Sequence, residues 1–320
     1  MEHGNGSPPV IVDGRAAVVE NWAAIVGQWL FQPGEAQYLG PSEAQPPPSY
    51  GVAVSDVQLR DGVVRAGIRF EGLDQQEPPT GGVILGFRSQ RDSYVMAQLG
   101  AYGFEFAISE FNPTSGWRAL ERAGSSQNLS PGRSYAVEVT QRGQGLSLVV
   151  DHVPIFNLVL PSPLVGNQVG LFAWGAYPVF FSHITAQQER PRAFVAMQFG
   201  EPYDTIYREV IKPGAEDSGF DVLRIDETVG PGLIFEDIKR EIGEAKVVIA
   251  EITAPNQNVF YEVGYAHALN KPTVLLAQRG RELPFDIRSY RVIFYEDTIG
   301  GKPSVEKSLA KHLNSILKDL

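Results

Sequence analysis

The sequence predicts two domains of different fold class, an all-β sandwich followed by an α/β domain with a parallel sheet. Between about residues 49 and 185, short segments alternate apolar and polar side chains, and Gly, Pro, Asn and Asp separate them. From residue 190, short apolar segments alternate instead with longer segments of helical periodicity. A chain of 320 residues can form a core in each part. Polarity rises and Pro191 interrupts strand pairing where the periodicity changes, so we expect domains at residues 1–189 and 190–320.

The composition excludes several classes of function. The chain carries 27 Lys and Arg against 37 Asp and Glu, a formal net charge of −10, and no basic cluster alternates with aromatics, so we expect no direct nucleic-acid partner. Cysteine is absent, which excludes disulfides, thiolate metal sites and cysteine nucleophiles. No apolar run approaches the roughly 20 residues that span a bilayer, and the first residues lack the features of a signal peptide. We therefore expect a cytoplasmic protein without a membrane partner.

Five segments of the first domain show the period-two alternation of antiparallel strands without intervening helices, which is typical of a β-sandwich. Two carboxylates, Glu105 and Glu110, lie on one alternating segment and are interpreted as solvent-facing charges rather than the acid pair of a glycosidase. We therefore expect no catalysis in this domain. The five predicted strands cover residues 63–70, 94–99, 104–108, 135–140 and 146–150.

The order of four motifs in this domain resembles the concanavalin A-like lectin or laminin-G-like jelly roll. The resembling segments are residues 82–88, 129–135, 149–154 and 168–175. The resemblance implies a jelly-roll sandwich that senses a ligand or assembles subunits. Its expected partner is a glycan or a protein, or it joins subunits of the same chain.

The second domain contains five apolar segments separated by segments of helical spacing. Right-handed crossovers between successive parallel strands predict a doubly wound, flavodoxin-like sheet of order 2-1-3-4-5. Gly219 is expected to end the first helix, and the last helix is amphipathic. The predicted strands are residues 193–197, 220–225, 247–252, 273–277 and 291–295, and the predicted helices are residues 203–218, 233–245, 259–269 and 304–317.

One carboxylate, Glu262, lies a single turn inside a helix that is otherwise apolar and aromatic. The segment before this helix, residues 246–252, is a predicted buried strand, so Glu262 would lie just beyond the carboxyl end of the parallel sheet. Ligands bind at that edge in α/β folds. Apolar neighbours at Phe260, Val263 and Ala266 favour a pocket over a surface position for this carboxylate.

The segment from Lys246 to Leu269, with Lys271-Pro272 after it and the motif at residues 283–288, resembles a known family. It is similar to the TIR-like nucleotide-binding domains related to nucleoside 2-deoxyribosyltransferases, and the resemblance spans nearly all of residues 191–320. It implies cleavage of an N-glycosidic bond, in the TIR branch usually that of nicotinamide in NAD, by one helix-borne glutamate. By this resemblance Glu262 is the catalytic residue.

Three further candidates follow strands of the predicted sheet and are expected to bind substrate. Phe199 comes after the first strand and either stacks on a base or packs against the first helix. Asp226 comes after the second strand and either accepts ribose hydroxyls or forms a turn. Glu251 ends the central strand and matches an acidic position of the deoxyribosyltransferase relatives, where it holds sugar hydroxyls or pairs with a cation.

Two more candidates lie on the helix that carries Glu262. Asn258 precedes Glu262 by four residues, hence lies one turn earlier on the same face, where it can cap the helix and also contact substrate. Tyr261 either flanks the substrate or packs. The sequence contains no metal-binding motif such as HExxH, and no GxGxxG or Walker loop follows the first strand. We therefore expect no metal or cofactor, with NAD as substrate only.

The preferred hypothesis is a prokaryotic defence-type effector. Prokaryotic TIR-family enzymes are commonly inactive until clustering completes the pocket, so the resemblance implies a homo-oligomer or filament in which the sandwich senses a signal and the α/β domain depletes NAD. One alternative is deoxyribosyl transfer or N-glycosidic hydrolysis on nucleosides or nucleotides. The other is a non-catalytic scaffold that binds a nucleotide or a glycan.

Overall fold

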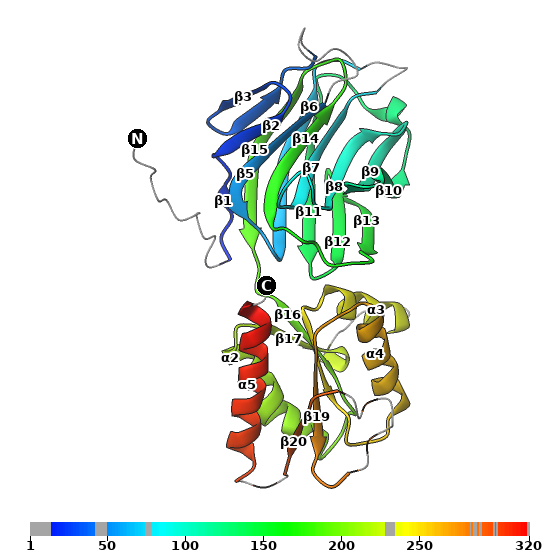
Figure 1. Cartoon of the computed structure of the whole chain (residues 1–320). Coiled ribbons are helices and arrows are strands. Elements are labelled where there is room, and N and C mark those ends of the chain that lie inside the picture. Colours follow the sequence, from blue (N-terminus) through cyan, green and yellow to red (C-terminus); the bar gives the residue numbers. More distant parts are fainter. Residues whose placement is uncertain are drawn as a thin grey trace, which may run out of the picture. The chain divides into compact units, whose positions relative to one another are not determined.

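The computed structural model describes residues 14–41, 50–73, 78–227, 234–281, 283, 287, 290–296, 298 and 300–318 (Figure 1). The chain divides into two compact units. The first runs to Glu189, except that Arg142–Gly145 and Val159–Ser162 group with the second unit, which otherwise begins at Arg190. The motif residues 284–286 and 288 lie outside the described residues.

The first unit contains two antiparallel sheets, and the larger has eight strands among the described residues. The central strand β15 pairs with β6 over most of its length, from Val179 opposite Phe70 to Gln188 opposite Gly62. In sheet order the strands are β13 (Val153–Val159), β12 (Gly145–Val150), β11 (Ser134–Arg142), β6 (Gly62–Phe70), β15 (Val179–Gln188), β4 (Glu35–Tyr38) and β3 (Trp29–Gln32), with β1 (Ala17–Val18) pairing with β15 off this path.

The second sheet of the sandwich has seven strands in the described part of the chain. The short 3-10 helix η1 (Ser126–Asn128) follows its edge strand β10. The five predicted strands of this domain are confirmed, each extended by one to four residues in the structure. In sheet order the strands are β10 (Gly116–Ala123), β9 (Phe104–Asn112), β8 (Tyr94–Ala101), β7 (Thr80–Phe87), β14 (Gln168–Trp174), β5 (Tyr50–Gln58) and β2 (Trp22–Val26).

Both faces of the seven-stranded sheet are covered at its centre. Every residue of β7 and β8 is buried, although alternating strands normally bury one face only. A Cβ at Gly81 would meet Ile68 and Val179 of the other sheet, so this side faces the sandwich core. Ile84 of β7 and Met96 of β8 belong to a separate apolar cluster on the side of this sheet that faces away from the other sheet. The sheet therefore carries a second, outer cluster in addition to the core between the sheets.

The second unit is a five-stranded parallel sheet with helices on both faces, in the order β17-β16-β18-β19-β20. Numbered within the domain, this order is 2-1-3-4-5, so the predicted flavodoxin-like fold class is confirmed, as is the sandwich. The strands are β16 (Arg192–Ala196), β17 (Asp221–Arg224), β18 (Val247–Glu251), β19 (Thr273–Gln278) and β20 (Val292–Tyr295). The helices are α1 (Tyr203–Ile206), η2 (Tyr207–Ile211), α2 (Lys212–Asp217), η3 (Ile225–Glu227), α3 (Ile234–Glu244), α4 (Gln257–Ala268) and α5 (Lys302–Lys318).

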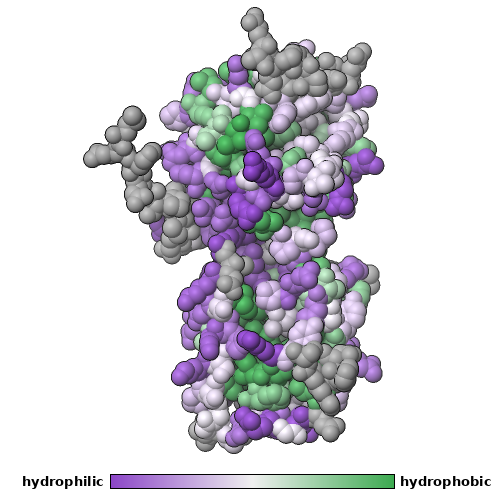
Figure 2. Space-filling model, in the orientation of Figure 1, coloured by the Kyte–Doolittle hydropathy of each residue, from purple (hydrophilic) through white to green (hydrophobic). Residues whose placement is uncertain are grey.

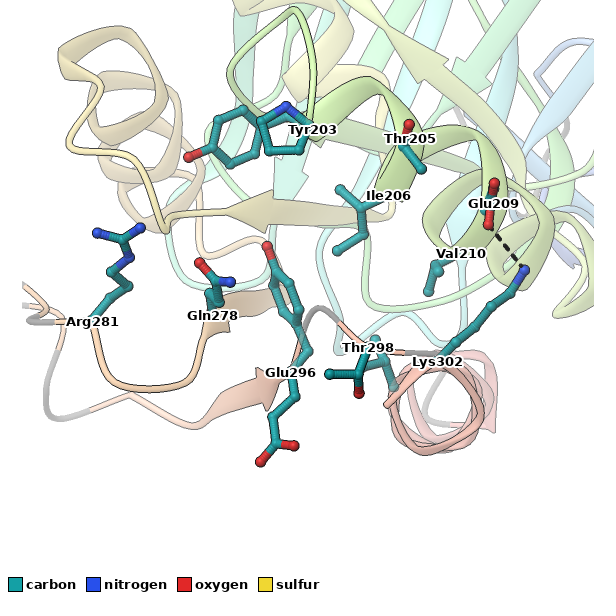
Figure 3. A pocket seen from close by; sticks show the side chains of 13 residues that line it. Tyr203, Thr205, Ile206, Glu209, Val210, Gln278, Arg281, Glu296, Thr298 and Lys302 are labelled. Atoms are coloured by element: carbon teal, nitrogen blue, oxygen red, sulfur yellow. Dashed lines mark hydrogen bonds and ion pairs between the residues drawn. The ribbon is translucent and has the colours of Figure 1, made fainter. Parts of the chain in front are cut away.

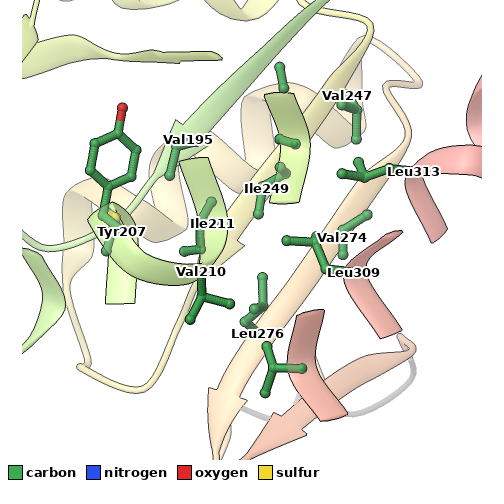
Figure 4. Packing of buried hydrophobic residues seen from close by; sticks show 14 of the residues in the cluster. Val195, Tyr207, Val210, Ile211, Val247, Ile249, Val274, Leu276, Leu309 and Leu313 are labelled. Carbon is green, nitrogen blue, oxygen red and sulfur yellow. The ribbon is translucent and has the colours of Figure 1, made fainter. Parts of the chain in front are cut away.

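Strand alternation divides the core of this unit into two clusters, one on each face of the sheet. Val247 and Ile249 of β18 belong to the cluster that also contains residues of η2, α2 and α5 (Figure 4). Val248 and Ala250 belong instead to the cluster formed with α3 and α4. In Figure 1, α5 lies on one side of the parallel sheet and α3 and α4 lie on the other. These two sides are called the α5 face and the α4 face below.

The first helical segment differs from the single α-helix predicted over residues 203–218. It contains a π-helical turn, η2, between α1 and α2. Pro213, the second residue of α2, lacks a backbone N–H, so the regular hydrogen bonding of an α-helix cannot continue through this position. The segment ends at Gly219 as predicted, with a positive φ of 93° that favours glycine.

The visible surface is mostly polar, with a few apolar areas (Figure 2). On the first unit, apolar residues gather over β2 and β3, where Ile25 and Leu30 are exposed. Among the helices that the structure describes, none is both long enough and apolar enough to cross a membrane.

Candidate functional site

Helix α4 presents Glu262 on its inner face. The helix starts after Asn256, whose side-chain Oδ1 accepts a hydrogen bond from the backbone N–H of Asn258 at 2.9 Å. This cap fixes where the helix begins and therefore which residues face the sheet. The buried residues of α4 recur at helical spacing and are Val259, Glu262, Val263 and Ala266.

The Glu262 side chain is buried without a compensating partner. The residue is 6% exposed, and among the described residues its carboxyl group has no hydrogen bond and no ion pair. Burial alone raises the pKa of this carboxyl to about 7. The predicted burial of Glu262 is therefore confirmed, and the group can lose or gain a proton near neutral pH.

Glu251 is also buried, but it lies on the other face of the sheet. It is 1% exposed and continues the series of Val247 and Ile249, which face α5. Its Oε1 accepts hydrogen bonds from the Tyr295 hydroxyl at 3.0 Å, from the Thr253 backbone N–H at 3.1 Å and from the Thr253 hydroxyl. Burial raises the pKa of Glu251, and these hydrogen bonds oppose the rise. The structure therefore does not bring Glu251 and Glu262 together on one face.

Phe199 and Asp226 meet through an arginine that sequence reasoning missed. The buried Arg224 donates to both carboxylate oxygens of Asp226 at 2.6 Å and to Asp204 at 2.8 Å. Its guanidinium also lies over the rings of Phe199 at 5.3 Å and Tyr207 at 4.2 Å. The carboxylate of Asp226 is therefore already bound by Arg224, as a fork-to-fork pair. Phe199 remains half exposed beside this cation.

Asn258 and Tyr261 lie on the exposed part of α4. The prediction that Asn258 caps the helix is wrong, because Asn256 supplies the capping oxygen two residues earlier. Tyr261 is 45% exposed and packs against Phe235 of α3, with ring centroids 5.2 Å apart. Packing on α3 is thus the contact that Tyr261 makes in this structure.

A cavity of about 850 Å³ opens on the α5 face at the carboxyl ends of β19 and β20 (Figure 3). None of the predicted site residues lines it. Tyr203, Gln278, Arg281 and Tyr295 are among its lining residues. A signal for them existed in the sequence, because Gln278 and Tyr295 end parallel strands at the ligand-binding edge of the sheet.

The sandwich carries a second cavity, of about 590 Å³, on the outer side of the seven-stranded sheet. Aromatic side chains dominate its walls, and none of its described lining residues is charged. The Phe172 ring contacts Tyr50 at 6.3 Å and Trp117 at 5.3 Å between centroids. The other lining residues are Pro78, Thr80, Met96, Gln98, Ala101, Tyr102, Gly103 and Trp174.

The floor of this cavity, called the aromatic basin below, holds one amide with an unused acceptor. Gln98 is 2% exposed and donates from Nε2 to Ser109 Oγ at 2.7 Å. Its Oε1 has no hydrogen-bond partner among the described residues. Gln98 and Met96 pack directly against the backbone of Gly82, where a Cβ would meet them at 2.8 and 2.9 Å. This acceptor is fully buried beneath the cavity surface, and leaving it without a partner costs free energy.

No protein-family model matches the chain, and no curated protein matches it. Solved structures similar to this chain include a carbohydrate-binding module from Bacillus subtilis, with 12% identity and a TM-score of 0.44, covering 53% of this chain and 96% of that chain. A galectin from Caenorhabditis elegans has 14% identity and a TM-score of 0.31, covering 47% of this chain and 94% of that chain. A β-glucanase from Bacillus licheniformis has 9% identity and a TM-score of 0.39, covering 53% of this chain and 93% of that chain. The likeness concerns the jelly-roll fold of the sandwich and extends to no ligand.

Proposed function

We propose that the α/β domain hydrolyses the N-glycosidic bond of NAD and releases nicotinamide, with Glu262 as the catalytic residue. The observation that carries this proposal is the buried carboxyl on the inner face of α4, which has no partner in the described part of the chain and a pKa raised to about 7. A structural carboxylate at such a depth is normally paired. An isolated one with a shifted pKa is typical of a functional site.

The chemistry requires little more than a well-placed negative charge. Nicotinamide is bound to ribose through a pyridinium nitrogen that is already cationic, so it leaves without protonation and generates an oxocarbenium-like centre. A carboxylate in a poorly solvated site stabilises that cation, captures it as a transient ester or takes a proton from water. In this scheme Glu262 acts in its ionised form, and Phe199, held beside Arg224, offers an exposed ring for a base.

The resemblance to TIR-like domains adds a biological setting to this proposal. The chain would be a prokaryotic defence-type effector that depletes NAD after a signal, or assembly into an oligomer or filament, activates it. Nucleosides or nucleotides are the alternative substrates, because the same oxocarbenium chemistry cleaves their N-glycosidic bonds. A scaffold that binds a nucleotide without chemistry is the non-enzymatic alternative.

Product analysis at several protein concentrations tests the assignment. Concentrated protein is incubated with NAD, nicotinamide is quantified, and the wild type is compared with Glu262→Gln, which removes the charge and keeps the shape. Glu216→Gln, an exposed glutamate on α2, is the matched control. We expect nicotinamide from the wild type and from the control, and a loss in Glu262→Gln. Equal turnover in all three proteins would exclude Glu262 as the catalytic residue.

We also propose that the aromatic basin binds a neutral saccharide. The observation that favours this second function is the combination of aromatic walls with the absence of charge among the described lining residues. A sugar ring offers apolar C–H faces to aromatic rings. A glycan array compares the wild type with Tyr102→Ala, which removes an exposed ring at the rim, and with Tyr177→Ala as an exposed tyrosine outside the basin. A signal that Tyr102→Ala leaves unchanged would argue against the basin.

A further inference from the structure

The cavity on the α5 face is separate from the Glu262 site. Residues of α1, η2 and α5 and the ends of β19 and β20 line it, and all of these lie on the α5 face. Glu262 faces the sheet from α4 on the other side, among the cluster of Val259, Val263 and Ala266. A volume of about 850 Å³ is ample for a small organic molecule, since such sites measure roughly 300–1,000 Å³.

Behind the wall of this cavity lies the buried Glu251 carboxyl, with one oxygen in use and one without a partner. Its Oε1 accepts from Tyr295 and Thr253, whereas its Oε2 is fully buried and has no partner among the described residues. Tyr295 lines the cavity and donates its hydroxyl proton to Glu251. The Tyr295 oxygen also lies 3.4 Å from Thr253 Oγ1, and it has two lone pairs, so it can still accept a hydrogen bond from the cavity.

Other neutral polar groups of the lining are also unused. The side chains of Tyr203 and Gln278 make no hydrogen bond in the described part of the chain, although the Gln278 backbone N–H donates to Thr253 Oγ1 at 2.8 Å. The charge of Glu251 raises the pKa of Tyr203, after the larger effect of burial, while the charge of Arg281 lowers it. Tyr203 is therefore within electrostatic range of both Glu251 and Arg281.

The charged groups of the lining other than Arg281 form ion pairs, and Lys302 also lies 4.0 Å from Glu306. Glu209 pairs with Lys302 at 3.5 Å, the contact drawn as a dashed line in Figure 3, and Glu296 pairs with Arg279 at 3.3 Å. Arg281 has no ion pair among the described residues. In Figure 3, the side chains of Tyr203, Gln278 and Arg281 lie toward one end of the cavity, away from the Glu209–Lys302 pair. In the described part of the chain, one end of the cavity therefore combines hydroxyl and amide groups with Arg281, a cation without an ion pair.

We propose that this cavity is a second ligand site that takes a sugar phosphate. The sugar hydroxyls bind to Tyr203, Tyr295 and Gln278, and the phosphate binds to Arg281, whose planar guanidinium matches phosphate oxygens. Glu251 is a positioning residue here, because it holds the Tyr295 hydroxyl without lining the cavity. The proposal stands without NAD cleavage, since none of these residues belongs to the Glu262 site.

Calorimetric titration of the full chain with ribose 5-phosphate tests this site, with ribose and inorganic phosphate as separate probes. We expect saturable binding of ribose 5-phosphate and weaker binding of either part alone. Arg281→Gln should weaken the affinity about tenfold or more, because it removes a charge-assisted contact. Tyr295→Phe should weaken it several-fold. Arg208→Gln, an exposed arginine outside the cavity, and Glu262→Gln should leave the affinity within about twofold of the wild type.

Each other result would overturn the proposal. Absence of saturable ribose 5-phosphate binding by the wild type, or equal binding by Arg281→Gln, removes the sugar-phosphate site. Inorganic phosphate binding as tightly as ribose 5-phosphate would leave an anion site without sugar recognition. Loss of binding in Glu262→Gln would move the ligand to the α4 face. Because NAD cleavage is measured separately, failure of this site and failure of the proposed activity give different results.

Discussion

Two buried glutamates on opposite faces of the parallel sheet, Glu251 and Glu262, differ in their hydrogen-bond partners. On the α5 face, Glu251 accepts three hydrogen bonds on one oxygen, from Tyr295 and Thr253. On the α4 face, Glu262 has no partner among the described residues, and its pKa rises to about 7. The two side chains are buried to a similar extent, so burial alone does not explain why they differ. They differ in their hydrogen-bond donors. A carboxyl that accepts hydrogen bonds stabilises the structure around it, whereas one without donors remains available for chemistry.

Shortening each carboxylate by one methylene tests this difference most strongly. Glu262→Asp keeps the charge but withdraws it from the reacting centre, so we expect NAD cleavage to fall about a hundredfold. Glu251→Asp should change turnover less than about fivefold, because Glu251 lies on the other face of the sheet. Steady-state release of nicotinamide measures both. Equal losses in the two variants would show that the two carboxylates act in one site.

The pH dependence of stability should show the isolation of Glu262 directly. Its pKa is higher in the folded protein, about 7, than the usual 4.5, so the folded state holds this proton more tightly. The stabilisation is therefore complete below about pH 4.5 and is lost as the pH rises toward 7. Between pH 5 and pH 8 the free energy of unfolding of the wild type should fall by about 2 kcal/mol relative to Glu262→Gln. Denaturant titration at both pH values measures this difference, and parallel pH profiles would contradict it.

The hydrogen-bond network of Glu251 should contribute a smaller amount of stability. Tyr295→Phe removes the hydroxyl that donates to Glu251 at 3.0 Å. We expect the free energy of unfolding to decrease by about 1 kcal/mol, because a buried carboxyl oxygen loses one of its donors. Tyr290→Phe is the control at an exposed tyrosine. Denaturant titration at pH 7 measures the stability of both variants. If Tyr295→Phe is as stable as the wild type, the hydrogen bond to Glu251 does not stabilise the fold.

The smallest effect is expected on the outer side of α4. Tyr261→Ala removes the ring that packs on Phe235 but leaves the inner face of the helix unchanged. NAD turnover should remain within about twofold of the wild type. A loss of turnover as large as that of Glu262→Asp would indicate that Tyr261 contacts the substrate.

The sequence was sufficient to predict the order of strands and helices, because period-two and helical patterns identify the two domains and right-handed crossovers determine the sheet order. It was also sufficient for the burial of Glu262, since apolar neighbours at Phe260 and Val263 identify the inner face of α4. These features are local in the chain, or follow from chirality, and need no knowledge of tertiary contacts.

The partners of the other candidates could not be predicted in the same way. The ion pair between Asp226 and Arg224 depends on where the fold places the guanidinium, which also lies over the rings of Phe199 and Tyr207. Asn256 caps α4 in the structure. The sequence does not distinguish it from Asn258, because asparagine is favourable at the cap in either position. For Glu251, alternation with Val247 and Ile249 does assign the α5 face, but only once the helices have been placed on the two faces.

Direct titration of the Glu262 carboxyl tests whether this group is isolated in the folded protein. Carbon-13 labelled glutamate and NMR follow the carboxyl resonances of the wild type from pH 3 to pH 9, and Glu262→Gln identifies the signal by its absence. We expect a midpoint near 7 for this resonance. A midpoint near 4.5, the value of an ordinary solvated glutamate, would mean that Glu262 is hydrated or paired and would contradict its assignment as the isolated carboxyl of the active site.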